Sequence, residues 1–94
     1  MLRISVKDNP NGLHLKLEGK LIPPWTSELE SVWHQIVTNL DGKKLHIDLC
    51  GTTFVDHEGM HLLRAIVDVA NPDIEANSPL TRQFAEQARC KAQA

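Results

Sequence analysis

Two histidines and a glutamate lie at a spacing that is typical of zinc metalloproteases. His57, Glu58 and His61 fit the pattern H-E-x-x-H, in which two histidines one helical turn apart bind Zn²⁺ and the glutamate acts as general base. The third and sixth positions after His61 are Arg64 and Val67, so the glycine and histidine of the extended motif are absent. A chain of 94 residues also leaves little room for a substrate cleft. We therefore expect no metal centre and no catalytic residue, although His57 and His61 have the spacing for adventitious metal binding.

These residues follow a transition from a strand to a helix. Residues 45–50 alternate as an apolar strand, the pattern breaks at Gly51, and apolar residues return at positions 54 and 55. Asp56 stands at the position of a helix N-cap, where a carboxylate can accept hydrogen bonds from the unpaired amides of the first turn. Free N–H groups and the positive end of the helix dipole point out of such a loop, so we expect the functional site there. The apolar residues that predict the helix are Met60, Leu63, Ile66, Val67 and Ala70.

The first half of the chain predicts two strands and a helix. Alternation of apolar and polar residues predicts strands over residues 2–7 and 13–18, and the turn formers between them favour an antiparallel hairpin. An apolar stripe from Trp25 to Leu40 predicts a helix with both tryptophans in the core. Its start is open between a capping box of Ser27 and Glu30 and an earlier start at the two prolines, 23 and 24.

The second half predicts two helices around one weak strand. The helix after Asp56 is apolar on two sides, which leaves a narrow solvent face. A short strand is expected at Ile74 and Ala76, and Ser78-Pro79 opens a last helix as N-cap and first residue. The polar stripe of the first of these helices is formed by His57, His61, Arg64 and Asp68, and the apolar stripe of the last helix by Leu80, Phe84 and Ala88.

The order of these elements predicts the fold class. Strand, strand, helix, strand, helix, weak strand and helix indicate an α/β fold in which a small mixed β-sheet of about four strands packs with three helices. The length of 94 residues and a hydrophobic content of 41% suit one globular domain over residues 1–94. No repeat or linker divides the chain.

Charge and composition exclude several classes of partner. The net charge is −2 without a basic cluster, so nucleic acid has little to bind. No apolar run approaches the roughly 20 residues that span a bilayer, and we expect no insertion into a membrane. Cys50 and Cys90 lie far apart without metal-type spacing, which favours two free thiols in a reducing cytoplasm. The expectation is a cytoplasmic protein that needs no cofactor.

The central stretch resembles the signature of a known family. Residues 47–63, IDLCGTTFVDHEGMHLL, resemble STAS domains, the sulfate-transporter and anti-sigma-factor-antagonist family. In that signature a strand ending in Asp-Leu leads to a small-residue loop, an apolar pair and Asp-Ser/Thr-x-Gly at the start of a helix. Residues 17–21, LEGKL, are similar to the end of the family's second strand, and Trp25–Leu29 lies where its first helix begins. The resemblance covers roughly residues 13–88 and implies a STAS-like fold and a non-catalytic protein–protein interaction module in bacterial regulation.

The chain departs from this family at the phosphorylated position. Antagonists carry a Ser or Thr there, and this chain has His57, which has no hydroxyl for a Ser/Thr kinase to modify. Thr52 and Thr53 carry hydroxyls, but they precede the apolar pair and do not match the switch position. Glu58 is one residue away from that position and carries half the charge of a phosphate. The resemblance therefore implies a binding module without the phosphorylation switch.

We expect a protein partner to bind at the start of the helix. The partner implied by the resemblance is an anti-sigma factor or related kinase, and the chain could form a homodimer. One alternative is a regulatory subunit of a lipid ABC transporter, whose partner is another transporter subunit. A second is a zinc-dependent hydrolase built on the two histidines and the glutamate of the H-E-x-x-H match. The expected partner-binding surface consists of Gly51, Thr52, Thr53, Asp56, His57, Glu58, Gly59, His61 and Arg64.

Overall fold

The computed structural model describes residues 2–40 and 42–89, which form four strands and three helices. The sheet has the order β1-β2-β3-β4, with β1 antiparallel to β2 and with β2, β3 and β4 parallel. The predicted α/β class, with a mixed sheet of four strands and three helices, is confirmed. Cys90, for which a free thiol is predicted, lies outside the described residues. The elements are β1 (Leu2–Asn9), β2 (Gly12–Leu21), α1 (Trp25–Asn39), β3 (Lys44–Val55), α2 (His57–Ala70), β4 (Asp73–Glu75) and α3 (Pro79–Arg89).

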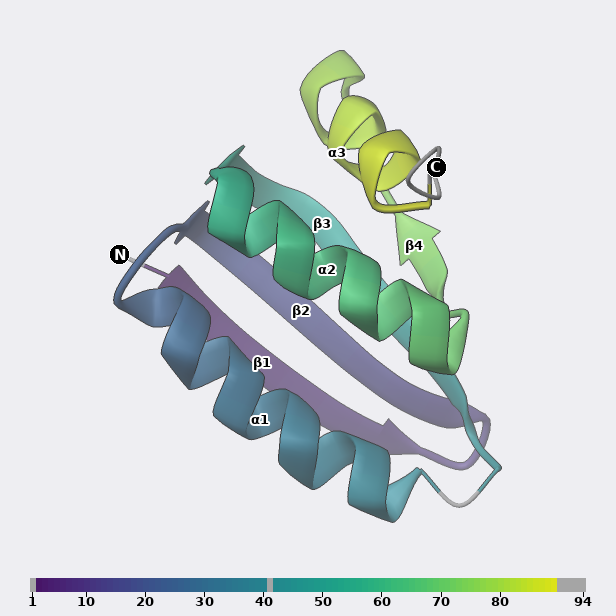
Figure 1. The fold of residues 1–94 in the computed structure, drawn as a ribbon. Helices are drawn as coiled ribbons and strands as arrows, with labels where there is room; N and C mark the ends of the chain where they lie inside the picture. The colour runs from purple at the N-terminus through teal and green to yellow at the C-terminus, as the bar shows by residue number, and fades with distance from the viewer. Residues whose placement is uncertain (1, 41, 90–94) are drawn as a thin grey trace.

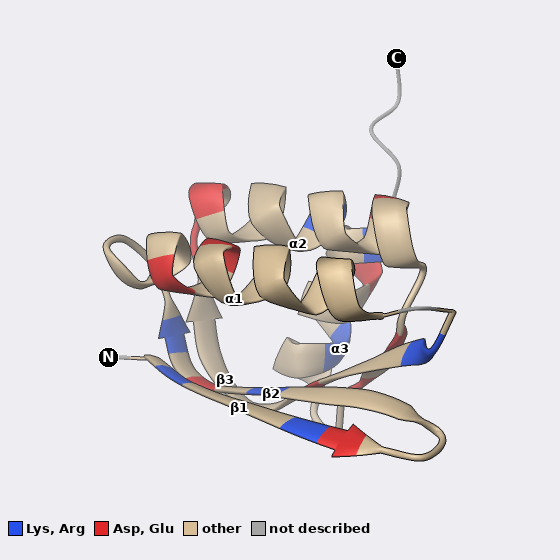
Figure 2. Ribbon diagram, turned by 90° about the horizontal axis from the view of Figure 1, so that it is seen from below, with Lys and Arg blue, Asp and Glu red and all other residues tan. Residues whose placement is uncertain are grey.

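The helices enclose the core against one face of the sheet. Figure 2 shows α1 and α2 side by side over the strands. The third helix, α3, packs against α2 and β3, on the side of α2 away from α1 (Figure 1). Strand β4 pairs only with residues 46–48 of β3, so the sheet is narrow at the end where β3 runs into α2. The start of α2 thus lies close to α3, and these two helices position the site described below.

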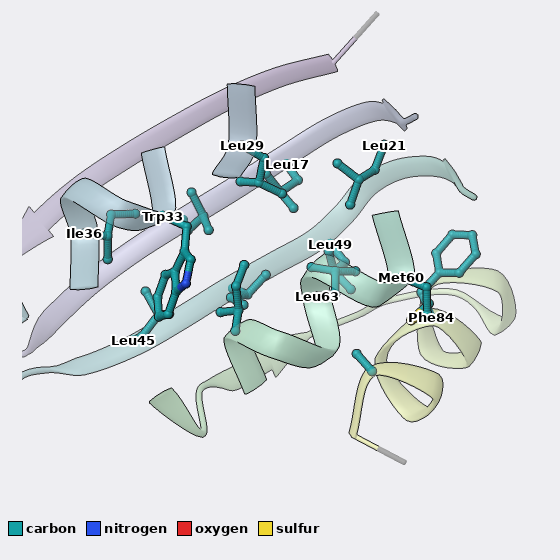
Figure 3. Packing of buried hydrophobic residues seen from close by; sticks show 14 of the residues in the cluster. Leu17, Leu21, Leu29, Trp33, Ile36, Leu45, Leu49, Met60, Leu63 and Phe84 are labelled. Carbon is teal, nitrogen blue, oxygen red and sulfur yellow. The ribbon is translucent and has the colours of Figure 1, made fainter. Parts of the chain in front are cut away.

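The two central strands, β2 and β3, contribute six leucines to the core, namely Leu13, Leu15, Leu17, Leu21, Leu45 and Leu49. Figure 3 shows how these side chains meet those of the three helices. Trp33 is buried and Trp25 is half-buried against the core, as the apolar stripe predicts. Helix α1 begins directly after Pro24 and has no side-chain cap, so the earlier start is correct and the capping box of Ser27 does not form. The fully buried residues include Leu15, Leu17, Leu21, Leu29, Leu49 and Ile66.

Strand β3 is longer than its sequence indicates. The expected loop at Gly51–Thr53 belongs to the strand, which runs from Lys44 to Val55 without a break. Two irregularities in its register with β2, after Lys16 and after Gly19, each accommodate one extra residue of β3. The pairing partner that absorbs these residues is more than 30 positions away in the sequence. The alternation of apolar and polar residues is therefore interrupted at these positions, although the strand continues.

Two helical faces differ from the expected ones. On α2, Ala65 is exposed and Val69 keeps 65% of its surface exposed, so the solvent face is wider than the predicted polar stripe. On α3, Leu80 is exposed and Thr81 takes the buried position. The start of α3 agrees with the prediction, because the Thr81 amide donates to Ser78 Oγ over 3.1 Å. The buried Thr81 hydroxyl is satisfied, because it accepts a hydrogen bond from the Ser78 amide and is also hydrogen-bonded to the Ser78 hydroxyl.

Candidate functional site

Asp56 caps α2 as predicted. Its backbone is extended, and its Oδ1 accepts a hydrogen bond from the Gly59 amide over 2.8 Å. Its own amide donates to the Leu21 carbonyl over 3.2 Å, which ties the start of α2 to the end of β2. The helix start is therefore fixed to the sheet on both sides of the cap.

Gly59 holds the first turn of α2 close to the sheet. It is buried, and a Cβ at this position would lie 2.5 Å from the Leu21 carbonyl oxygen and 2.8 Å from Leu21 Cγ. Only glycine fits this approach without a shift of the backbone. Gly59 therefore lets α2 pack on β2, and its expected contact with a partner stays a prediction.

A pocket lies beside this helix start, between α2 and the C-terminal part of α3. Its volume is about 260 Å³. The side chain of Arg64 is anchored at the α3 side, because its Nε donates to the Gln87 carbonyl over 3.0 Å. Half-buried Val55 and buried Met60 supply apolar lining. The lining residues are Val55, Asp56, His57, Met60, His61, Arg64 and Gln87.

The pocket brings together four of the nine residues of the expected surface, namely Asp56, His57, His61 and Arg64. Glu58 is exposed next to the pocket without lining it. The other three lining residues, Val55, Met60 and Gln87, were not part of the expected surface, and the position of Gln87 depends on how α3 packs against α2.

The three residues before the apolar pair lie elsewhere. Thr52 is only 2% exposed, and its hydroxyl donates to the Leu17 carbonyl over 3.0 Å. Gly51 packs against the Glu18 side chain, where a Cβ would lie 2.8 Å from Glu18 Cγ. Thr53 is exposed but does not line the pocket. The loop expected for residues 51–53 is thus replaced by strand, and the expected contact of Thr52 with a partner stays a prediction.

The two histidines of the H-E-x-x-H match are both exposed on the first two turns of α2. Across residues 2–40 and 42–89, no group of three or more His, Cys, Asp or Glu side chains has an arrangement that could hold a metal ion. Within that part of the chain, the zinc-hydrolase alternative therefore lacks a third ligand.

A pair of stacked imidazoles lies on the sheet, away from the pocket. The rings of His14 and His46 are 4.6 Å apart between centroids and inclined by 13°. His46 Nδ1 also lies 3.6 Å from a carboxylate oxygen of Asp73. The two rings meet because His14 and His46 are register partners, and this pairing of β2 with β3 cannot be inferred from either strand alone.

Asp48 acts locally, and it affects the neighbouring thiol. Its Oδ1 accepts the Cys50 amide over 2.9 Å. The hydrogen bond from the Cys50 side chain to Asp48 raises the pKa of this thiol, and burial and the charges of Asp48 and Glu75 raise it further. The Cys50 thiol is thus kept protonated and is a poor nucleophile at neutral pH.

Comparison with known proteins gives a likeness of fold. No family model and no curated protein matches the chain. A solved structure of Mglu overlaps 80% of the chain with a TM-score of 0.62 and 15% identity, and this chain spans only 19% of that protein. An uncharacterized protein from the DUF3478 family with a SpoIIAA-like fold, from Shewanella loihica PV-4, matches 90% of this chain and 91% of its own, with a TM-score of 0.41 and 13% identity. At 15% identity, the likeness to Mglu concerns the fold alone.

The three helices have 15, 14 and 11 residues, fewer than the roughly 20 residues that span a bilayer. None of the helices formed by the described residues is long and apolar enough to cross a membrane.

Proposed function

We propose that this chain is a STAS-like protein–protein interaction module of bacterial regulation, which binds a protein partner at the start of α2 and catalyses no reaction. The observation that carries the proposal is the pocket beside that start, which is lined by four residues of the expected surface. The pocket coincides with the stretch whose sequence resembles the STAS signature.

The roles of the signature residues support this proposal. The Asp56 carboxylate caps α2, and a glycine is required at position 59 because α2 closely approaches Leu21. The two positions between them, His57 and Glu58, are exposed. A pattern of Asp-x-x-Gly therefore builds the helix start and leaves its two middle positions free to contact a partner.

The partner is proposed to bind without control by phosphorylation at this position. His57 is the first residue of α2 and is exposed, but it has no hydroxyl to accept a phosphate from a Ser/Thr kinase. Thr52, the nearest buried hydroxyl in the sequence, already donates to Leu17. The proposed partner is an anti-sigma factor or related kinase, and the alternative is a subunit of a lipid ABC transporter.

An affinity pull-down with mass spectrometry tests the surface. We expect the wild-type chain to retain a protein partner, and Glu58→Lys combined with Arg64→Glu to lose it. Both side chains are exposed, so this double variant should unfold within a few degrees of the wild type.

A matched control uses the same two charge reversals away from the pocket. Arg3 in β1 and Glu75 in β4 are exposed strand residues, and neither lines the pocket. Arg3→Glu combined with Glu75→Lys should keep the partner. The proposed surface is wrong if the variant of residues 58 and 64 binds as well as this control.

A further inference from the structure

We propose that the pocket between α2 and α3 receives an acidic side chain, Asp or Glu, of the protein partner. This inference rests on the proposed function and adds the chemistry of the contact. The argument concerns the end of the pocket at Arg64, where residues of both helices meet.

Arg64 supplies a positive charge that no acid of the described residues neutralises. The ion pairs within 4 Å in that part of the chain involve Lys43, Lys44 and His46, and none involves Arg64. Asp68 lies one helical turn further along α2 and still does not pair with it. A guanidinium at the wall of a pocket without an internal counter-ion is suited to an external carboxylate.

The anchoring of Arg64 favours a carboxylate held by two hydrogen bonds. Its Nε uses one of the five guanidinium N–H donors in the bond to the Gln87 carbonyl. The remaining donors match the two oxygens of a carboxylate. Because α3 already orients the side chain, less rotamer freedom is lost when the partner binds.

The rest of the lining selects a singly charged group on an apolar stem. Val55 and Met60 offer apolar contacts to methylene groups, and His61, one turn before Arg64, offers imidazole N–H donors. Asp56 also lines the pocket, and it lies eight residues or about 12 Å along the helix axis from Arg64. With one guanidinium and one carboxylate in the lining, a dianionic phosphate group would be poorly compensated, whereas one carboxylate can sit at the Arg64 end.

A titration followed by NMR tests the pocket without a partner. The probe is glutamate blocked as the N-acetyl and N-methylamide derivative, and the matched probe is the same derivative of glutamine. We expect the glutamate probe to shift the amide signals of residues 57–64 and 87 and to saturate with a Kd of about 1–10 mM, as suits a small ligand. The glutamine probe has the same shape without the charge and should give no saturating shift.

Variants assign the binding to the guanidinium. Arg64→Gln should abolish the saturation, and Arg64→Lys should weaken it, because an ammonium keeps the charge but loses the two-donor geometry. Arg3→Gln, which removes an exposed arginine from β1, should bind the glutamate probe as the wild type does. The inference is overturned if the glutamate probe does not saturate, if glutamine binds equally, or if Arg64→Gln binds unchanged.

These outcomes are separate from those of the pull-down. If the titration fails, an acidic side chain of the partner is ruled out as the occupant of the pocket, and the proposed partner-binding surface is not affected. If the pull-down shows that the variant of residues 58 and 64 binds as well as its control, the proposed surface is wrong. The inference then has no protein partner to rest on, even if the glutamate probe binds. Where a partner is retained, Arg64→Gln should weaken the complex by about 30-fold or more, the effect of removing one member of a buried charged pair.

Discussion

At the scale of single residues, the central stretch divides into residues that build the helix start and residues that face solvent. Asp56 and Gly59 belong to the first group, since one caps α2 and the other allows its approach to Leu21. His57, Glu58, His61 and Arg64 belong to the second group, and all four are exposed. The sequence predicts the cap from residue type and position alone. It could not show that Gly59 is structural, because the atom that requires a glycine belongs to β2.

A substitution at Gly59 tests this division. Gly59→Ala places a methyl group against the Leu21 carbonyl and should lower the free energy of unfolding by about 1–3 kcal/mol, the usual cost of overpacking. Urea unfolding followed by circular dichroism measures the change. Glu58→Ala, at the exposed position before it, is the control and should change the stability by less than about 0.5 kcal/mol. Equal effects of the two substitutions would contradict the close approach of α2 to β2.

At the scale of elements, the periodicity of apolar residues predicted whether each segment is a helix or a strand, and the pairing between strands determined where β3 ends. The hairpin, α1, the short β4 and the cap of α3 follow from local patterns. The continuation of β3 through Gly51 does not, because its two irregularities depend on the register with β2. The predicted solvent face of α2 was also too narrow, because Ala65 and Val69 are apolar but exposed to solvent. The sequence predicted a contact surface at the start of α2 but no pocket, because Gln87 reaches the lining only through the packing of α3 against α2.

Thr52 tests whether β3 continues as a strand. Thr52→Val keeps the shape of the side chain and removes the hydroxyl that donates to the Leu17 carbonyl, which should cost about 1–2 kcal/mol of unfolding free energy. Thermal unfolding compares it with Thr53→Val, whose exposed side chain should tolerate the change within about 0.5 kcal/mol. If Thr52→Val left the stability unchanged and reduced partner binding instead, Thr52 would belong to a contact loop.

At the scale of the whole molecule, the fold is explained by its apolar core. Buried side chains from β2, β3 and the three helices form one continuous cluster. That residues 1–94 form a single domain stays a prediction, and among the described residues no group of three or more His, Cys, Asp or Glu side chains could hold a metal ion. The stability of the molecule should therefore be independent of divalent metals.

Metal removal tests this expectation. We expect Zn²⁺ to bind weakly at most to His57 and His61, and to leave on dialysis, because two imidazoles on an exposed helix face make an incomplete site. The melting temperature should be the same with and without a chelator. One tightly held Zn²⁺ per chain in elemental analysis, together with unfolding on chelation, would favour the hydrolase alternative.

The backbone hydrogen bond from the Asp56 amide to the Leu21 carbonyl has a consequence for the kinetics of partner binding. Since the start of α2 is tied to β2 and capped by Asp56, a partner that bound there, as proposed, would meet a surface that is ordered before binding. Association should then need no folding step, and its rate should be set by diffusion and orientation, about 10⁵–10⁷ M⁻¹s⁻¹. Substitutions of the surface residues would then change mainly the dissociation rate of the proposed complex.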